Sequence, residues 1–410
     1  MQNNKSASAR LAPWLLVAVA FLALALAFSA RSALGLAMPV WERELGWPRS
    51  FVSFGGALAL VVMAVVAPVA GNLVDRYGPR LLLAVGTAVV GLGMALVAGT
   101  EGRWLFLVGF SGVAGLGFGM VATHVVATAV ARLFERHRGL AIGIATSGAT
   151  AGQLAVVPLL ALLLQWAHWR WSFLALAVGC LALLPCVLLV LRSGRPTTAA
   201  GRDEAPEPLR QRLAFLLRSP VFHVLFWSFA ICGFTTTGVI ETHLLPYAAA
   251  CGFPPLPSAT AYGVLSAVNL AGMVAAGWLT DRVNRPLLLA AIYIARGLSF
   301  IVLLYVASDI RLLFVFAVIF GIFDYSTVPP TASLVASHLG LRVMGLAMGL
   351  ISAGHSLGGA VGAFLGGWLF DLFARYDWVW LLSIVLALLA GLLVLLLREA
   401  GGLRVLARPA

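Results

Sequence analysis

The segment GNLVDRYGPR, residues 71–80, follows a long apolar run and has a second copy further along the chain. That copy, GWLTDRVN, begins at Gly277, which is 206 residues later. The segments RGLAIGIATSGATAG, from Arg138, and MGLAMGLISAGHSLGG, from Met344, are separated by the same 206 residues. Two matches at one offset indicate that the chain consists of two related halves.

The composition indicates a protein that lies in lipid. Of the 410 residues, 61% are hydrophobic and 10% are charged, whereas a soluble domain has about 25% charged residues. Apolar runs close to the roughly 20 residues that a membrane-spanning helix needs recur along the chain. They predict an all-α membrane protein with twelve transmembrane helices over residues 13–38, 50–74, 81–99, 104–131, 139–164, 170–191, 220–247, 258–280, 287–307, 311–337, 343–371 and 378–397. A cleaved signal peptide over residues 1–30 is the alternative for the first run, but that run is too long for one.

One long polar stretch divides the chain. It predicts an N-terminal six-helix bundle over residues 1–192, a cytoplasmic linker over 193–218 and a C-terminal six-helix bundle over 219–410. Of the 27 Lys and Arg residues, 19 fall on the side of the N-terminus, six fall on the other side, and Arg31 and Arg296 fall inside spans. Because basic residues favour the cytoplasmic side, we expect both termini in the cytoplasm. The net charge of +12 therefore reports topology, and we expect no nucleic-acid partner.

The repeated segment resembles the loop after the second span of the major facilitator superfamily, Gly-x-Leu-x-Asp-Arg-x-Gly-x-Arg. The resemblance implies two pseudo-repeats, each of six helices, with a substrate site between them near the middle of the membrane. It also implies a conformational loop in which Asp75 and Arg76 pair with neighbouring helix ends in one state and release them in the other. The residues expected to form this loop and its repeat are Gly71, Asp75, Arg76, Gly78, Arg80, Gly277, Asp281 and Arg282.

Three further segments resemble the bacterial oxalate/formate antiporter and monocarboxylate porter group. They are LAMPVWERELGWPRS, RLFERHRGLAIGIATSGATAGQLAVVPLL followed by WRWSFLALA, and THLLPYAAACG. The resemblance implies a non-enzymatic secondary active transporter of a small organic anion, a monocarboxylate or dicarboxylate, coupled to a proton in symport. It further implies alternating access, a bacterial inner (plasma) membrane location and a monomer. We expect no cofactor and no metal, and a P-loop for nucleotides is absent from the sequence.

Arg31 lies within the first apolar run, where a charge costs about 2.5–3.5 kcal/mol on insertion scales. The resemblance implies that the first helix lines the cavity and carries a basic residue near this place. An arginine fits a carboxylate because its planar fork donates two parallel hydrogen bonds. The sequence leaves two interpretations open, namely that Arg31 binds substrate or that it forms a structural ion pair with Glu241.

Asp324 lies in GIFDYSTVPPT. In a continuous helix, Gly321, Asp324, Thr327 and Thr331 would share one face. Asp324 is a candidate for proton coupling, because a carboxyl group that is removed from water can hold a proton at neutral pH. The alternative is a structural pair between Asp324 and Arg296, whose predicted spans are adjacent.

Other intramembrane polar residues are weaker candidates. His355 is a candidate for binding the anion or for gating, although an interhelical hydrogen bond is an equal alternative. Glu241 is a second candidate for proton coupling. Tyr325 and Asn269 are candidates for donating hydrogen bonds to a bound carboxylate, with hydrogen bonds between helices as an equal alternative. His243, Glu241 and His124 are weaker candidates, because a polar rim residue is the default.

One departure from the resemblance concerns the substrate. The monocarboxylate porters carry an arginine in their eighth helix, and the span over residues 258–280 has none. Arg31, His355 or Arg296 would have to replace it. The rival interpretation on the same fold is a drug or lipophile efflux transporter, in which the intramembrane charges are structural. A sensor or receptor would need a soluble signalling domain, which the sequence does not indicate.

Overall fold

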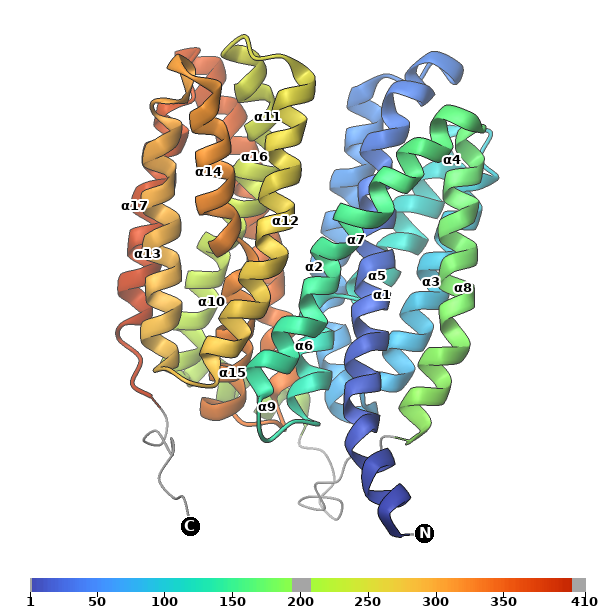
Figure 1. Cartoon of the computed structure of the whole chain (residues 1–410), viewed down its shortest axis with the longest axis vertical. Coiled ribbons are helices and arrows are strands. Elements are labelled where there is room, and N and C mark those ends of the chain that lie inside the picture. Colours follow the sequence, from blue (N-terminus) through green and yellow to red (C-terminus); the bar gives the residue numbers. More distant parts are fainter. Residues whose placement is uncertain (1, 194–207, 400–410) are drawn as a thin grey trace.

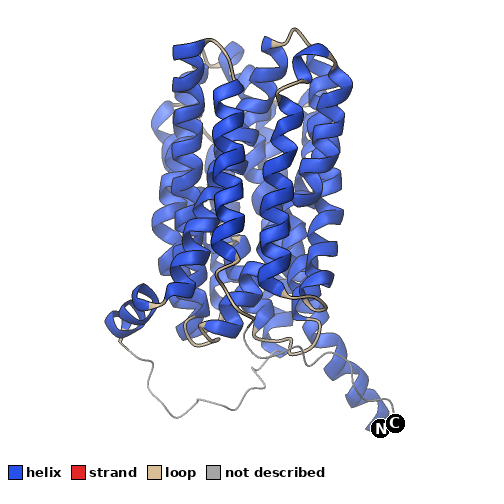
Figure 2. Ribbon diagram, turned by 90° about the vertical axis from the view of Figure 1, so that its left-hand side faces the viewer, coloured by secondary structure: helices blue, strands red, loops and turns tan. Residues whose placement is uncertain are grey.

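The computed structural model describes residues 2–193 and 208–399, and they form a bundle of long helices that run side by side along one axis (Figures 1 and 2). The first half contains α1 (Gln2–Glu44), α2 (Arg49–Tyr77), α3 (Pro79–Ala98), α4 (Arg103–Phe106), η1 (Leu107–Ala114), α5 (Gly115–Met120), α6 (Thr123–Ala131), α7 (Arg138–Trp166) and α8 (Trp169–Ser193). The second half contains α10 (Pro220–Gly233), η2 (Phe234–Ile240), α11 (Glu241–Ala250), α12 (Pro255–Thr280), α13 (Arg285–Leu303), η3 (Val306–Ser308), α14 (Ile310–Phe323), η4 (Tyr325–Thr327), α15 (Val328–His338), α16 (Met344–Phe373) and α17 (Asp377–Val394).

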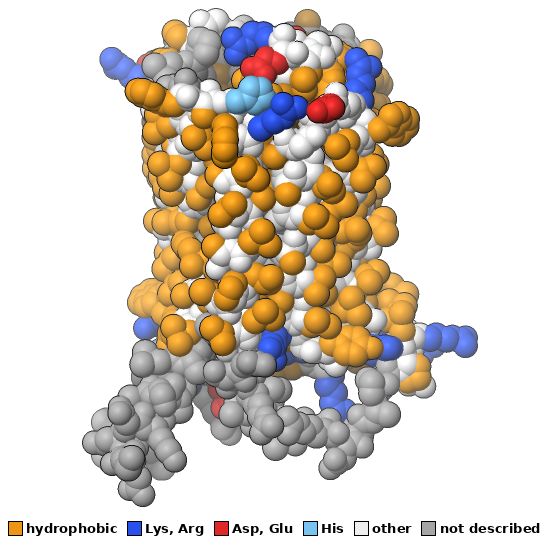
Figure 3. Space-filling view, turned by 90° about the vertical axis from the view of Figure 1, so that its right-hand side faces the viewer, with side chains coloured by type: hydrophobic (Ala, Val, Ile, Leu, Met, Phe, Trp, Pro, Cys, Tyr) orange, Lys and Arg blue, Asp and Glu red, His pale blue; other side chains and the backbone are white. Residues whose placement is uncertain are grey.

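Twelve candidate membrane spans lie in the described ranges, which confirms the all-α fold class. A helix α9 (Leu209–Arg218), not foreseen in the sequence, occupies the end of the expected linker. Apolar side chains cover the middle of one face of the bundle, and charged side chains gather at its two ends (Figure 3). This is the surface that a protein surrounded by lipid hydrocarbon needs, because a charge costs free energy there.

Three of the spans are interrupted where the sequence predicts continuous helices. The fourth span breaks between α5 and α6, and π-helical segments occupy parts of the fourth and seventh spans. The tenth span passes through the 3₁₀ turn η4 between α14 and α15. The expected single helical face from Gly321 to Thr331 is therefore wrong, because the chain changes its helical period at Asp324.

The two halves meet tightly at the end of the bundle where α1 begins, here called the lower end (Figure 1). There α2 packs on α16 and α7 packs on α12. A Cβ atom on Gly139 would lie only 2.5 Å from the carbonyl oxygen of Gly277, and one on Gly71 would collide with the carbonyl of Gly345. These glycines permit the close backbone contact that small residues give in membranes. The upper part of the second half has a separate core around Phe300, Phe316 and Trp380.

Candidate functional site

A cavity of about 80 Å³ lies between the two halves. Residues of both repeats line it, namely Phe28, Arg31, Leu60, Met63, Ala67, Gly119, Ala122, Thr123, His124, Phe229, Thr237, Tyr325, Val328, Ser352, His355 and Ser356. Its position is the one that the sequence repeat predicts for a substrate site. The lining has one arginine and two histidines, and no Asp or Glu side chain of the described residues belongs to it. Arg31 is thus the one permanently charged side chain among the described lining residues.

Arg31 is half-buried in this lining and has no hydrogen-bond or ion-pair partner among the described residues. Its one recorded contact places the guanidinium carbon 4.6 Å from the centroid of the Phe28 ring, one turn earlier on α1. The expected alternative, a pair with Glu241, does not occur in this conformation. Five N–H donors of a permanent cation thus remain available in the cavity.

Tyr325 links the cavity to the carboxylate of Glu241. Its hydroxyl group donates a hydrogen bond of 2.8 Å to Glu241 Oε1. Glu241 thus bonds Tyr325 and forms no ion pair with Arg31 in this conformation. His355 lies on the same wall, with its ring 4.9 Å from the ring of Phe229. Of the residues expected to bind substrate, the structure brings Arg31, Tyr325 and His355 together.

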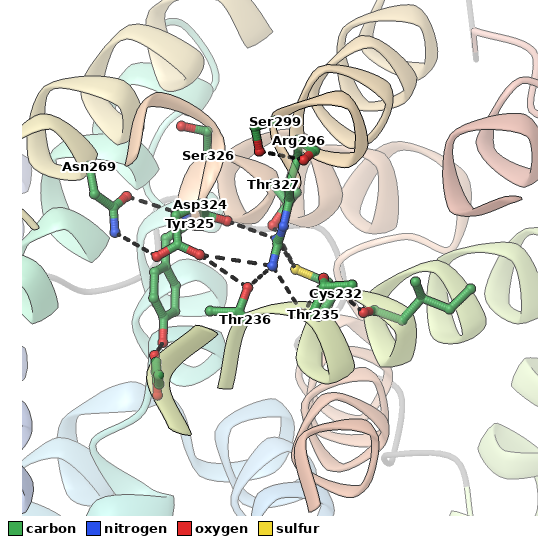
Figure 4. A network of polar contacts seen from close by, with 12 residues as sticks. Cys232, Thr235, Thr236, Asn269, Arg296, Ser299, Asp324, Tyr325, Ser326 and Thr327 are labelled. Carbon is green, nitrogen blue, oxygen red and sulfur yellow. Dashed lines mark hydrogen bonds and ion pairs between the residues drawn. The ribbon is translucent and has the colours of Figure 1, made fainter. Parts of the chain in front are cut away.

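Asp324 and Arg296 lie in a buried polar network next to the cavity (Figure 4). Arg296 is fully buried, and its Nη2 lies 3.9 Å from Asp324 Oδ1. The guanidinium also donates to Cys232 Sγ at 2.9 Å, to the carbonyl oxygens of Cys232 and Asp324 at 3.2 Å, and to the Thr236 hydroxyl group. Asp324 in turn accepts from Thr236 Oγ1 at 3.1 Å.

Asn269 and His243 lie outside the cavity lining. Asn269 joins the network instead, donating to Asp324 Oδ2 at 3.4 Å and to Thr150 Oγ1 of the other half at 3.5 Å, and accepting from the Tyr325 amide at 3.2 Å. His243 Nε2 lies 3.0 Å from the Ala363 carbonyl oxygen, within the second half. A hydrogen bond between helices therefore satisfies each of these side chains.

The repeated loops close the lower end by capping helices across the two halves. Asp75 accepts from the amides of Gly345 and Leu346 at 2.8 and 2.9 Å, at the start of α16. Asp281 accepts from Gly139 and Leu140 at 2.7 and 2.9 Å, at the start of α7. A carboxylate at a helix N-terminus satisfies orphan N–H groups and the helix dipole. We call these the Asp75 clamp and the Asp281 clamp.

The other loop residues have more local roles. Gly78 ends α2 with φ +79°, a conformation that favours glycine. The side chain of Arg76 is exposed and has no partner among the described residues, so its pairing with a helix end is not seen in this conformation and stays a prediction. Arg80 also has none there, and Arg282 stacks over its own neighbour Trp278 at 4.0 Å.

The sequence reading missed four residues that complete these networks. Arg132 and Arg212 both bond the carboxylate of Asp75, and Arg212 comes from α9 in the linker. The spacing of Leu209, Leu213 and Leu216, four and three residues apart, is the signal that would have predicted α9 as an amphipathic helix. Cys232 and Thr236 hold Arg296, and their ordinary apolar and small polar side chains carried no such signal.

Comparison with known proteins agrees with this geometry. The family model "Major Facilitator Superfamily" matches residues 20–309 and 271–408. The chain is 30% identical to human monocarboxylate transporter 11 over 90% of this chain and 79% of the relative. It is 27% identical to bovine monocarboxylate transporter 13 over 88% of this chain and 84% of the relative.

Solved structures share the fold. The E. coli fucose:proton symporter superposes with a TM-score of 0.75 at 17% identity, covering 94% of this chain and 98% of that one. The human organic anion transporter MFSD10 gives a TM-score of 0.72 at 18% identity, covering 93% and 99%. With its two six-helix halves, central cavity and repeated clamps, the chain belongs to the major facilitator superfamily.

Proposed function

We propose that this transporter moves a small organic anion, a monocarboxylate or dicarboxylate, by proton-coupled alternating access. The observation that carries the proposal is the partnerless guanidinium of Arg31 in a cavity without a lining carboxylate. Monocarboxylate transporters of 27–30% identity among the relatives support the substrate class. A bound carboxylate would receive the bidentate hydrogen bonds that arginine gives best.

The size of the cavity favours a small substrate over a drug. Sites for drug-sized ligands have volumes of about 300–1,000 Å³, whereas this cavity has about 80 Å³. An acid of a few carbon atoms fits such a space. The efflux alternative would require the cavity to widen several-fold.

The lower end is the cytoplasmic end in this proposal, in the inner (plasma) membrane of a bacterium. The excess of basic residues on that side supports the assignment. The two clamps close that end, so the conformation corresponds to one in which the site is shut off from the cytoplasm. Breaking both clamps would open the site to the cytoplasm while the upper ends approach each other.

Glu241 is the better candidate for the proton. Asp324 accepts hydrogen bonds from Thr236 and Asn269 and lies beside Arg296, so its carboxyl group already has several partners within the protein. Glu241 accepts one hydrogen bond, from Tyr325, and no cation lies within 4 Å of it among the described residues. A proton on Glu241 would remove the negative charge nearest to the site when the substrate anion binds.

The test is uptake of labelled lactate, formate and oxalate into proteoliposomes. We expect Arg31→Gln to lower uptake about 10- to 100-fold, because a hydrogen-bonded charge contributes about 1.5–3 kcal/mol. Arg311→Gln is the matched control, since it removes an exposed arginine at the start of α14. The proposal would be contradicted if the Arg31→Gln variant took up every transported acid as fast as the wild-type protein.

A further inference from the structure

The fourth span stops and restarts at the wall of the cavity. Helix α5 ends at Met120, and the chain then passes through Val121 (φ −104°, ψ 64°) and Ala122 (φ −114°, ψ 160°) before α6 begins at Thr123. Ala122, Thr123 and His124 all line the cavity. The N-terminus of a nine-residue helix is thus directed at the site.

This helix N-terminus has unused hydrogen-bond donors. The amides of Val125 and Val126 both donate to the Ala122 carbonyl at 3.1 Å. The amides of Thr123 and His124 have no main-chain acceptor among the described residues, and Ala122 offers no side-chain cap. Free N–H groups and the positive end of the helix dipole together favour an anion.

His124 supplies an independent observation at the same place. Its side chain is only 2% exposed, and its Nε2 atom has no hydrogen-bond partner. The Ala67 carbonyl faces the ring from α2 without meeting the geometry of a hydrogen bond to Nε2. A buried imidazole nitrogen without a partner costs free energy unless a ligand or water satisfies it.

The second half cannot form such a cradle. Shifted by the repeat offset of 206 residues, Thr123 and His124 correspond to Pro329 and Pro330 at the start of α15. Proline has no N–H group, so this helix start offers no donors at these positions. The donors are therefore a specific feature of the first half and do not follow from the fold in general.

We propose that the start of α6, with the amides of Thr123 and His124 and the His124 ring, is a second anion subsite of the transport cavity. The inference rests on the proposed function and deepens it. Arg31 holds one carboxylate and the α6 start holds a second, so the preferred substrate is a short dicarboxylate. A cavity of about 80 Å³ limits such a substrate to a few carbon atoms.

The experiment measures the affinity of the purified full-length protein for three pairs of acids by calorimetry. Each pair combines a dicarboxylate with its monoamide of equal heavy-atom count, namely oxalate with oxamate, malonate with malonamate, and succinate with succinamate. We expect at least one dicarboxylate to bind about tenfold more tightly than its monoamide, since hydrogen bonds to ionised groups are about twice as strong as neutral ones. Lactate is measured as the monocarboxylate reference.

Thr123→Pro removes one subsite N–H and keeps the helix start. The extended conformation of Ala122 is the one that a residue before proline adopts, and proline is favoured at the first helical position. We expect this variant to reduce the dicarboxylate preference at least about threefold. Thr123→Ala, which loses the same side chain and keeps the N–H group, should retain the wild-type preference.

The possible outcomes separate the two proposals. If Thr123→Pro keeps the wild-type preference, or if only lactate and the monoamides bind, the subsite inference is overturned and the proposed function stands. If no acid binds, the proposed function fails and this inference fails with it. If Thr123→Pro does not fold, two variants of His124 decide the question. His124→Leu should lower the preference for dicarboxylate over monoamide, and His124→Asn, which keeps a donor, should lower it less.

Discussion

Each half of the bundle has one arginine within its membrane spans, and the two arginines differ in their hydrogen-bond partners. Arg296 in the second half is fully buried and donates to Cys232, Thr236 and Asp324. Arg31 in the first half lies over the Phe28 ring and has no hydrogen bond or ion pair with any described residue. The difference separates a charge whose partners belong to the protein from a charge whose partner must come from outside.

The interrupted spans of the two halves also differ in whether their polar groups have partners within the protein. The break of the tenth span places Asp324 in a network of protein donors, and prolines follow it. The break of the fourth span carries no charge, and the first residues of α6 line the cavity. Asp324 thus has its donors within the second half, while the amides of Thr123 and His124 have no main-chain acceptor among the described residues. We infer that the second half supplies rigidity and the first half supplies most of the anion contacts.

The largest expected effect tests whether Arg296 is structural. Arg296→Met leaves Asp324 buried without its cation, so we expect a loss of about 3–5 kcal/mol of stability. The double variant Arg296→Met with Asp324→Leu should recover much of that loss, because an apolar pair of similar size is often as stable as a buried ion pair. Thermal unfolding of the purified protein measures both.

Arg31→Met is the matched variant for this comparison. It removes an arginine without a protein partner, so its melting temperature should stay close to that of wild type. Equal destabilisation by Arg31→Met and Arg296→Met would break the distinction between the two halves.

The second prediction compares the two clamps. Asp75 accepts hydrogen bonds from two amide groups and pairs with two guanidinium groups. Asp281 also accepts hydrogen bonds from two amide groups, but it has no ion pair within 4 Å among the described residues. We expect Asp75→Asn to weaken closure of the lower end by about 2–3 kcal/mol, because hydrogen bonds to charged groups are lost. Asp281→Asn should cost about 1 kcal/mol, as for one charge at a helix N-terminus.

The rate of hydrogen exchange at the capped amide groups measures how firmly each clamp is closed. Faster exchange is expected at Gly345 and Leu346 for Asp75→Asn, and at Gly139 and Leu140 for Asp281→Asn. Asp309→Asn, at the start of α14 on the opposite end, is the control and should leave both pairs unchanged. Equal acceleration by the two clamp variants would show that the arginines on Asp75 add nothing to closure.

Much of the fold could be predicted from the sequence, because apolar runs long enough to cross a bilayer permit few other structures. The repeat offset also predicted that Asp75 and Asp281 occupy equivalent positions. The breaks at Ala122 and at Asp324 could not be predicted in the same way, since apolar composition does not distinguish a straight helix from an interrupted one. Pro329 and Pro330 were a visible signal for the second break.

The site was only partly predictable, because partners depend on contacts between distant helices. Arg31, Tyr325 and His355 lie together in the cavity, but no sequence rule places the Tyr325 hydroxyl group on Glu241. Likewise, the resemblance named Asp75 and Arg76 as loop residues that pair with helix ends, but it did not indicate that Arg132 and Arg212 bond Asp75. Short-range patterns thus identify which charges are unusual, and the fold decides what each one contacts.

The third prediction concerns Glu241 in the second half, where a small effect on stability accompanies a large effect on proton movement. Glu241→Gln keeps an acceptor for the Tyr325 hydroxyl group, so the cost to folding should stay below about 1 kcal/mol. In the proposed mechanism this variant cannot release or take up the coupled proton. The alkalinisation that substrate causes outside proteoliposomes should therefore disappear. Exchange of labelled acid across the membrane should continue. Asp324→Asn is the comparison: if it abolishes proton movement and Glu241→Gln does not, then the buried network carries the proton and the second half is more than a rigid frame.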